Sequence, residues 1–377
     1  MPRRIPLLDL NAQHREIREQ ALAAVVRVVD SQRFILGGEV QELERGIAAY
    51  CSTDFAVGCA SGSDALLLAL VALGIGPGDE VLTTPYTFFA TAGSIVHAGA
   101  TPVFVDVDPA TFNMDVTRVE EVLAARPKIR AIIPVHLFGA CADMDPLLAL
   151  ARPRGIHVIE DAAQSIGAEY KGRRAGGLGD VACFSFYPSK NLSGYGDGGM
   201  LTTNDAALTE RLAALRVHGA DQKYIHEWVG FNSRLDAIQA AVLRVKLRHL
   251  DAWTDGRQRN AAFYQRRLAE LGVPVVAPVA AAHTTRHVFN QFVIRAPWRD
   301  ELRAHLAQQG VGTEVYYPLP LHLQPCFAHL GYRSGDFPVS ERLAAEILAL
   351  PVYPELSADD IEYVCQAMKT FYAGRSG

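Results

Sequence analysis

The sequence predicts an α/β protein: a mostly parallel sheet covered by helices on both faces, followed by a smaller α+β domain. Between residues 57 and 203, short apolar runs alternate with stretches of helical periodicity, the pattern of parallel strands joined by helical crossovers. Later in the chain this alternation stops. A length of 377 residues is also too great for one hydrophobic core and suits two domains.

The elements of the first domain follow from periodicity. Helices are expected over residues 16–29 and 40–50, where apolar residues recur at helical spacing. The expected strands cover residues 57–60, 80–84, 101–105, 131–135, 157–160, 181–184 and 200–202. Helical patterns lie between most of them, over residues 65–73, 89–97, 116–125 and 144–151. These runs predict a sheet of seven strands.

The pattern changes after a long helix expected over residues 235–250, whose apolar side chains share one face. Beyond it, strands are expected over residues 290–294 and 313–316, and helices over 300–309 and 340–350. We therefore expect a large domain over residues 1–250 and a small α+β domain over 251–377. A stretch rich in proline and alanine, residues 273–282, is another candidate for the boundary.

The composition argues against several classes of protein. Charged residues make up 20% of the chain and the formal net charge is −5, so no basic excess points to a nucleic acid partner. The apolar runs are too short to cross a bilayer, and no apolar signal segment follows the basic start of the chain. Six scattered cysteines without a C-x-x-C pair favour a reduced, cytoplasmic protein over one with a metal site.

An amine and a carboxylate follow two of the expected strands. Lys190 lies between the strand that ends at residue 184 and a glycine-rich turn over 194–199, and Asp161 ends another strand. Ligands bind beyond the carboxyl ends of parallel strands, so both side chains should face one site. Pyridoxal phosphate (PLP) requires this pair. Lysine holds its aldehyde as a Schiff base, and a carboxylate keeps the pyridine nitrogen protonated so that the ring works as an electron sink.

A third part of this edge is Ser61-Gly62-Ser63-Asp64, which leads directly into the helix expected from residue 65. Serine and aspartate are N-capping residues, so a helix cap is one interpretation. The other is a phosphate site made of free N–H groups, the positive end of the helix dipole and two hydroxyls. Because Lys190 and Asp161 lie at the same edge, we favour the phosphate site.

The glycine-rich turn also has the spacing of a dinucleotide-binding G-x-G-x-x-G motif. That motif follows a strand and opens a helix. Here the glycines precede the run Met200-Leu201-Thr202-Thr203, which has the pattern of a strand. We therefore reject a plain nucleotide-binding oxidoreductase and interpret the glycines as a tight turn that holds the Lys190 segment.

With these residues assembled, the chain resembles the DegT/DnrJ/EryC1/StrS family of PLP-dependent sugar aminotransferases over nearly its whole length. The resemblance implies an aspartate-aminotransferase-like fold (PLP fold type I). It rests on motifs at residues 61–66, 74–81, 160–164, 184–192, 196–199, 232–236 and 317–322. A few relatives that dehydrate sugars carry histidine in place of the lysine, so Lys190 indicates an aminotransferase.

The resemblance also implies a role for each candidate residue. Lys190 forms the Schiff base and moves the proton between substrate and cofactor carbons, Asp161 pairs with the pyridine nitrogen, and Gln164 contacts the ring hydroxyl. The residues expected to hold the phosphate or stack on the ring are Gly62, Ser63, Ser185 and Phe88, together with Asn232, which reaches the phosphate from the second subunit. Those expected to line the sugar-nucleotide site are Tyr187, Arg234, Tyr317 and His322.

The function implied is a homodimeric transaminase with shared active sites, acting on a nucleotide-linked keto-sugar with L-glutamate as amino donor. We favour C3 of a dTDP-linked 3-keto-6-deoxyhexose, because many relatives that aminate C4 carry an aromatic residue in place of Ser233 and methionine in place of Leu235. A small Ser233 is expected to leave space near the ring. The alternatives are a 4-keto-hexose substrate, a keto-inositol substrate and a non-catalytic regulator that keeps the fold.

Overall fold

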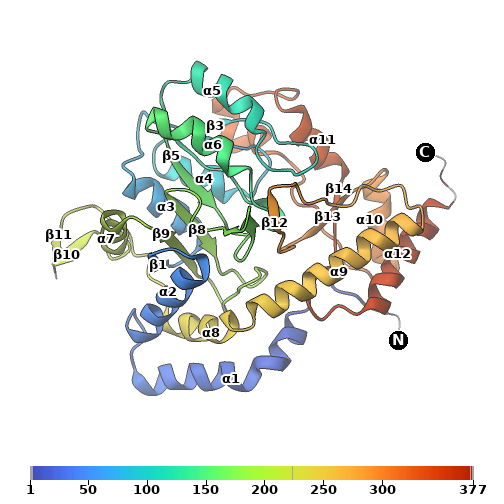
Figure 1. The fold of residues 1–377 in the computed structure, drawn as a ribbon, viewed down its shortest axis with the longest axis horizontal. Coiled ribbons are helices and arrows are strands. Elements are labelled where there is room, and N and C mark those ends of the chain that lie inside the picture. Colours follow the sequence, from blue (N-terminus) through green and yellow to red (C-terminus); the bar gives the residue numbers. More distant parts are fainter. Residues whose placement is uncertain (1–2, 223, 374, 376–377) are drawn as a thin grey trace.

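The computed structural model describes residues 3–222, 224–373 and 375. Within these residues the central sheet has seven strands in the order β1-β9-β8-β5-β4-β2-β3 (Figure 1). Their bounds are β1 (Phe55–Cys59), β2 (Glu80–Thr83), β3 (Thr101–Phe104), β4 (Ile129–Ile132), β5 (His157–Asp161), β8 (Val181–Ser185) and β9 (Gly199–Thr203). In this sheet β9 alone runs antiparallel to its neighbours, β1 and β8. The predicted mostly parallel sheet of seven strands is confirmed.

Helices cover both faces of the sheet because alternate strand residues point to opposite sides. Val81 and Ile159 pack with one group of helices, α3 (Gly62–Ala72), α4 (Ala90–His97) and α7 (Ala206–Leu215). Their neighbours Leu82 and Val158 pack with the other side, against α5 (Val119–Ala125) and α6 (Met144–Ala151). Under β8 and β9 that second side is formed by α2 (Gly38–Cys51) and α8 (Ala237–Leu247).

Two long helices lie outside these layers. The first, α1 (Leu10–Ser31), packs along α8 through an apolar cluster that includes Ile17 and Val245. The second, α9 (Leu250–Glu270), runs from the end of α8 to the C-terminal elements (Figure 1). This helix was not predicted. Its buried face includes Gly256 and Arg257, which interrupt the apolar periodicity that would have revealed it.

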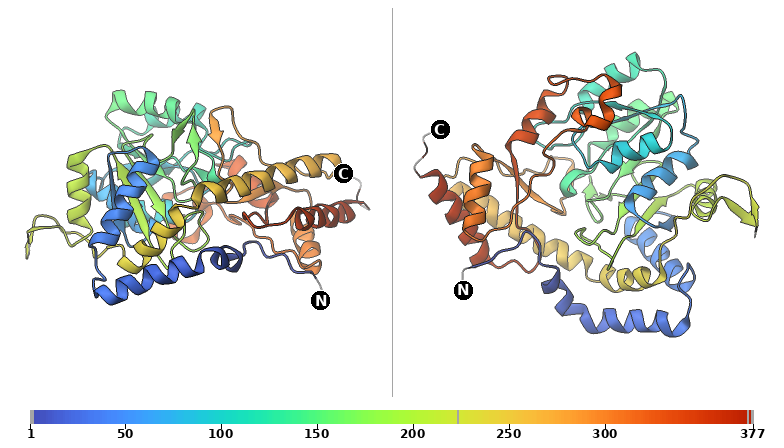
Figure 2. Two further views of the ribbon diagram at one scale, coloured as in Figure 1. Left: turned by 60° about the horizontal axis from the view of Figure 1, so that its bottom comes forward. Right: turned by 180° about the vertical axis from the view of Figure 1, so that it is seen from behind.

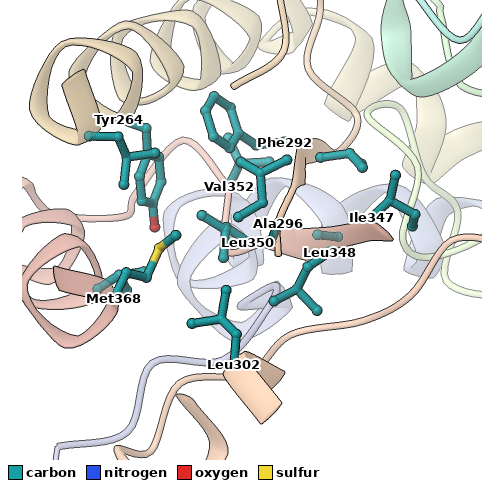
Figure 3. Packing of buried hydrophobic residues seen from close by; sticks show 14 of the residues in the cluster. Tyr264, Phe292, Ala296, Leu302, Ile347, Leu348, Leu350, Val352 and Met368 are labelled. Carbon is teal, nitrogen blue, oxygen red and sulfur yellow. The ribbon is translucent and has the colours of Figure 1, made fainter. Parts of the chain in front are cut away.

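The C-terminal elements supply most of a further hydrophobic core, which also includes side chains of the first part such as Val135 and Phe138. An antiparallel pair, β13 (Phe292–Arg295) and β14 (Ile347–Leu350), packs with α9, α10 (Arg299–Gln308) and α12 (Ala358–Tyr372). Side chains from all five elements meet there (Figure 3), among them Tyr264, Phe292, Leu302, Leu350 and Met368. The smaller α+β unit that the sequence predicts is therefore present in outline.

Two of its elements differ from the prediction. The helix expected over residues 340–350 ends early: α11 covers Pro338–Glu346, and the next four residues form β14. All four side chains of β14 are buried, and periodicity cannot distinguish such a short apolar run from a helix. The strand expected over residues 313–316 is reduced to a single bridge between Glu314 and Ala349.

Smaller elements connect the parts. A three-stranded sheet joins β6 (Glu169–Tyr170) and β7 (Arg173–Arg174) to β12 (Thr284–Arg286). Ile5 bridges to Val311, so the N-terminal segment packs into the C-terminal core.

The hairpin of β10 (Ala220–Gln222) and β11 (Ile225–His226) projects from the body of the molecule (Figures 1 and 2). Short 3₁₀ turns cover Val116–Arg118, Leu137–Gly139, Arg152–Arg154, Leu321–Leu323 and Pro325–Leu330. The predicted division at residue 250 stays a prediction.

Candidate active site

A cavity of about 510 Å³ lies beyond the carboxyl ends of β5 and β8, where the sequence predicts a site. Of the twelve residues predicted for the site, those that line it are Gly62, Ser63, Phe88, Asp161, Gln164, Ser185, Tyr187, Lys190 and Tyr317. They come from strand ends and loops between Gly62 and Tyr317, which are 255 residues apart along the chain. The parallel sheet brings most of them together, because its strands end at one edge.

One wall of the cavity is the N-terminus of α3. Ser61 is the N-cap, and its hydroxyl accepts from the Asp64 N–H at 3.1 Å. The next two residues, Gly62 and Ser63, lie in the first turn, where backbone N–H groups have no partner within a helix. A Cβ at Gly62 would lie 2.6 Å from the Cβ of Ser185, so only glycine allows this approach. Ser61 therefore caps the helix, while Gly62 and Ser63 stay available for a phosphate, so the two interpretations do not exclude each other.

Asp161 ends β5 and is 5% exposed. Its Oδ2 accepts from the Thr91 hydroxyl at 2.7 Å, and its Oδ1 accepts from the Ala163 N–H at 3.3 Å. Burial raises the pKa of this carboxyl above its usual value, and the hydrogen bond from Thr91 opposes that shift. A buried carboxylate at a cavity wall, bonded only to neutral donors among the described residues, suits a ligand with a cationic N–H.

The preceding residue, Glu160, fixes the end of the same strand. It is fully buried with His136, whose Nε2 is 2.9 Å from Glu160 Oε2. Its carboxylate also accepts from the N–H groups of Gly176, Leu178 and Gly179. Burial opposes ionisation, but these hydrogen bonds prevail and lower the pKa of Glu160. This network holds β5 in place and lies outside the cavity lining.

Lys190 faces the cavity from the loop after β8. Its backbone N–H donates to the Tyr187 carbonyl at 2.8 Å, closing a tight turn. Burial lowers the pKa of its amine to about 8, and the nearby Asp161 only partly offsets this shift. The glycine turn supports the loop, since the N–H of Phe186 donates to the Gly198 carbonyl at 2.8 Å. Among the described residues that line the cavity, Lys190 is the only lysine or arginine.

Aromatic and amide side chains form a further part of the cavity wall. Phe88 is 56% exposed, and its ring centroid lies 6.0 Å from that of Tyr317. Gln164 accepts from the Phe138 N–H at 2.7 Å and donates from Nε2 to the Tyr317 hydroxyl at 3.0 Å. Burial raises the pKa of Tyr317, so its phenol stays neutral at ordinary pH. One N–H of the Gln164 amide remains for a ligand.

Three predicted site residues are not on this cavity in the described protomer. Asn232 is exposed and pairs with Val217 in an isolated bridge. Arg234, two residues on, is half-buried. His322 is 2% exposed, and its Nε2 lies 3.1 Å from Glu341 Oε1, away from the cavity lining.

Ser233 does not leave the space that the sequence argument expected near the ring. Its side chain is 1% exposed. The hydroxyl donates to Asp64 Oδ2 at 2.7 Å and accepts from the Ala60 N–H at 3.3 Å. That expectation is wrong, because Ser233 supports the first turn of α3 and is absent from the cavity lining.

Several lining residues were missed by sequence reasoning, notably Thr87, Asp197, Gln291 and Tyr316. Sequence reasoning also missed Thr91. Its hydroxyl lies 3.0 Å from that of Thr87 and donates to Asp161. The two threonines follow β2 at a spacing of four, so their place after a strand was an available signal. Gln291 and Tyr316 come from the C-terminal part, and nothing local marks them.

Among the described residues, no group of three or more histidine, cysteine, aspartate or glutamate side chains is placed to hold a metal ion. In the same residues, no helix combines the length and apolar character needed to cross a membrane.

Comparison with known proteins decides the family. The model of the DegT/DnrJ/EryC1/StrS aminotransferase family matches residues 15–369. The chain belongs to this family. The resemblance inferred from the motifs is thereby confirmed, and with it the prediction of an aminotransferase.

Curated relatives match this aminotransferase over almost their full lengths. A pleiotropic regulatory protein of Geobacillus stearothermophilus is 52% identical, with 98% of each chain covered. The dTDP-3-amino-3,4,6-trideoxy-alpha-D-glucose transaminase of Streptomyces venezuelae is 47% identical, with 97% of this chain and 96% of the relative covered. The UDP-N-acetyl-3-dehydro-alpha-D-glucosamine 3-aminotransferase of Acidithiobacillus ferrooxidans is 45% identical, with 97% of each covered.

Solved structures share the fold of this aminotransferase. S. venezuelae DesV, in complex with a ketimine intermediate, is 47% identical with a TM-score of 0.95, and 100% of each chain is covered. The PLP form of Spr1654, a putative sugar aminotransferase of Streptococcus pneumoniae, is 26% identical with a TM-score of 0.89, covering 95% of this chain and 97% of the other. The predicted PLP fold type I is confirmed by these similarities.

The hydrogen bond from the Thr91 hydroxyl should hold the pKa of Asp161 below the value that burial alone would give it. Replacing Thr91 with valine keeps the shape but removes a hydrogen bond to a charged group, an interaction worth about 1.5–3 kcal/mol. We therefore expect Thr91→Val to raise the pKa of Asp161 further, and Thr91→Ser to leave it near the wild-type value. Infrared titration of the protonated carboxyl band in the ligand-free protein, assigned with Asp161→Asn, measures this. An unchanged Asp161 titration in Thr91→Val would remove Thr91 from this role.

Proposed function

We propose that the protein is a PLP-dependent transaminase that aminates a nucleotide-linked keto-sugar, with L-glutamate as amino donor. The observation that carries the proposal is the arrangement of Lys190, Asp161 and the N-terminus of α3 around one cavity. An amine, a carboxylate and an anion site are the three groups by which a protein binds PLP. The membership of the aminotransferase family supports the same conclusion.

The residues present fit this cofactor. Because Gly62 has no Cβ, Ser185 lies directly against the first turn of α3, so the Ser185 hydroxyl and the N–H groups of Gly62 and Ser63 can contact one phosphate. The buried carboxylate of Asp161 lacks a cationic hydrogen-bond partner among the described residues, and a pyridinium N–H supplies one. When bound, the cofactor provides an electron sink for the substrate carbanion.

The side chains then have separable tasks. With a pKa lowered to about 8, Lys190 is uncharged in an appreciable fraction of molecules near neutral pH, so Nζ can act as nucleophile and accept a proton from substrate carbon. Asp161, ionised by a cationic partner, keeps the ring nitrogen protonated. Gln164 is held by Phe138 and Tyr317 and offers its remaining N–H to the ring hydroxyl. Phe88 offers a ring face at the cavity mouth.

For the substrate, we favour amination at C3 of a dTDP-linked 3-keto-6-deoxyhexose. The support is the 47% identical S. venezuelae transaminase, whose name specifies a dTDP-3-amino sugar. The A. ferrooxidans relative is named for a UDP-linked 3-dehydro sugar, so it supports C3 and leaves UDP as a second candidate nucleotide. A 4-keto-hexose and a keto-inositol are the remaining substrate alternatives.

A second candidate function is regulation, since the 52% identical relative carries the name of a pleiotropic regulatory protein. A regulator that had lost catalysis would have no need to keep a reactive amine at the cavity. Lys190, Asp161 and Gln164 are all present and all line the cavity. This set favours the enzyme.

We also propose that the enzyme is a homodimer with shared sites, in which Asn232 reaches the phosphate bound by the partner. The support is its placement. Asn232 is exposed and absent from the cavity of its own protomer, so it is available to another subunit. Arg234, on the same segment, would supply positive charge for a nucleotide diphosphate. Tyr187 and Tyr317 line the cavity and would contact the sugar, whereas the buried His322 would act only through its neighbours.

Borohydride reduction of the holoenzyme should fix the cofactor on Lys190. We expect peptide mass spectrometry to find the cofactor mass on the peptide that contains Lys190, and Lys190→Ala to lose both the label and turnover. Lys246 is a matched control, because burial also lowers its pKa to about 8, yet it donates to Ser193 and does not line the cavity. A label on Lys246, or normal turnover by Lys190→Ala, would contradict the assignment.

The C3 preference can be tested with matched substrates. We expect the enzyme, with glutamate, to convert a dTDP-3-keto-6-deoxyhexose at least about tenfold faster than its 4-keto isomer, because a misplacement of about 1 Å at the reacting carbon can cost roughly 10²-fold. Mass spectrometry of the amino sugar measures both rates, and UDP-linked substrates test the nucleotide. Binding of free dTDP or UDP by calorimetry separates a nucleotide-sugar enzyme from one for keto-inositols. Faster conversion of the 4-keto isomer would refute C3 and leave the transaminase intact.

Sharing of sites predicts complementation. Lys190→Ala and Asn232→Ala homodimers should each be impaired. If Asn232 acts across the interface, their heterodimer contains one site with both residues intact and one with neither, so mixing should restore activity. Differently tagged subunits and tandem purification isolate the heterodimer for assay. Absence of recovery in that species would place Asn232 in the site of its own subunit or outside it.

A further inference from the structure

The residue that follows Lys190 connects the active-site loop to the C-terminal part of the chain. Asn191 Nδ2 donates to the Val288 carbonyl at 2.9 Å, and its Oδ1 accepts from Asn290 Nδ2 at 2.8 Å. Both asparagines are 5% exposed. Each of them adjoins a residue of the cavity lining, since Lys190 precedes Asn191 and Gln291 follows Asn290.

The segment that receives Asn191 is itself fixed from two sides. From α9, Arg257 donates to the carbonyls of Phe289 at 3.2 Å and Val352 at 2.8 Å. Burial lowers the pKa of Arg257 to about 10, which leaves it charged at neutral pH. From the large sheet's side, the Val288 N–H donates to the Gly139 carbonyl at 2.9 Å. A hydrogen bond from Asn191 therefore ends on a rigid support.

Packing alone does not account for the pair. Burying amides is unfavourable unless they are hydrogen-bonded, and apolar side chains of the same size would fill this place at lower cost. Asn290 Oδ1 has no hydrogen-bond partner among the described residues, so the pair carries that cost too. Directional hydrogen bonds do fix the relative position of two backbone segments. Here one segment carries Lys190 and the other carries Gln291.

We propose that the Asn191–Asn290 pair is a positioning clamp, which holds Lys190 and Gln291 at a set separation across the cavity and keeps the Lys190 amine in its place in the cavity wall. The turn that donates from the Lys190 N–H to Tyr187 fixes one side of this residue, and the clamp fixes the other. Neither asparagine lines the cavity, so both act through their neighbours. The proposal rests on the proposed function in taking Lys190 as the reacting amine.

Loosening the clamp should change the surroundings of the amine. The charged groups that line the same cavity are Asp161 on β5 and Asp197 in the glycine turn. Burial, with only partial compensation from Asp161, lowers the pKa of Lys190 to about 8 from the usual 10.5. If the loop drifts and Nζ becomes more exposed to water than in the wild type, the desolvation falls and this pKa should rise toward the usual value.

The experiment compares Asn191→Ala, Asn290→Ala and the double variant in ligand-free protein. Asn290→Leu tests the loss of the amide at similar volume. Asn260→Ala is the matched control, since Asn260 of α9 likewise donates from its side-chain amide to a backbone carbonyl, that of Tyr353 at 2.7 Å, but does not adjoin a residue of the cavity lining. The readout is the pH dependence of Lys190 acetylation by trace acetic anhydride, followed by peptide mass spectrometry, with circular dichroism to verify folding.

We expect the midpoint of Lys190 reactivity to rise in both single variants and in Asn290→Leu. The double variant should rise no further than the larger single variant, because the two residues act as one unit. Asn260→Ala should keep the wild-type midpoint. In the holoenzyme, kcat should fall up to roughly 10²-fold with a smaller change in KM, because the amine is misplaced while substrate contacts remain.

An unchanged midpoint in folded Asn191→Ala and Asn290→Leu would overturn the clamp. So would an equal rise in Asn260→Ala, which would reveal a general loosening of the C-terminal part. Because acetylation uses neither cofactor nor sugar, this result is independent of the substrate assays. Failure of the proposed function would instead appear as absent cofactor labelling in the wild type.

Discussion

The site depends on one close contact, between the first turn of α3 and the ends of β8 and β9. A Cβ at Gly62 would lie 2.6 Å from the Cβ of Ser185, and a Cβ at Gly199 would lie 2.3 Å from the carbonyl oxygen of Ser61. Two glycines thus allow the helix N-terminus to sit directly over the strand ends. Ser233 and Asp64 hold the same turn from the other side. Without this approach, the proposed phosphate site and Lys190 would belong to separate surfaces.

Burial disfavours the charged form of both ionisable groups at the centre of the cavity. It raises the pKa of Asp161 and lowers the pKa of Lys190. A bound cofactor that brings a cationic N–H and a phosphate would compensate both shifts. Among the described lining residues the only lysine or arginine is Lys190, so the charges of the proposed nucleotide-diphosphate substrate would need further partners from outside this lining. The proposed contribution of a second subunit answers that need.

The C-terminal part takes a direct share in the site. Gln291, Tyr316 and Tyr317 reach the cavity from it, and Tyr86 donates to the Tyr316 carbonyl at 2.8 Å from the opposite part. The core beneath these residues packs α9, α10 and α12 against two strands, which gives the aromatic wall a firm base. The central sheet and its loops therefore form only part of the cavity wall, and the C-terminal part supplies the rest.

The sequence by itself determined the residues whose position follows from chain order. Lys190, Asp161 and Gly62 could be predicted because each follows a strand of a parallel sheet, and such strands end at one edge. Tertiary structure decided the rest. Asn191 and Asn290 meet across 99 residues, and local periodicity carries no information about that distance. His322 is buried beside Glu341, which its Nε2 contacts, and Arg257 lies on the buried face of α9, where it donates to the Val352 carbonyl 95 residues along the chain. Burial of a polar side chain depends on those partners, so only the folded chain reveals it.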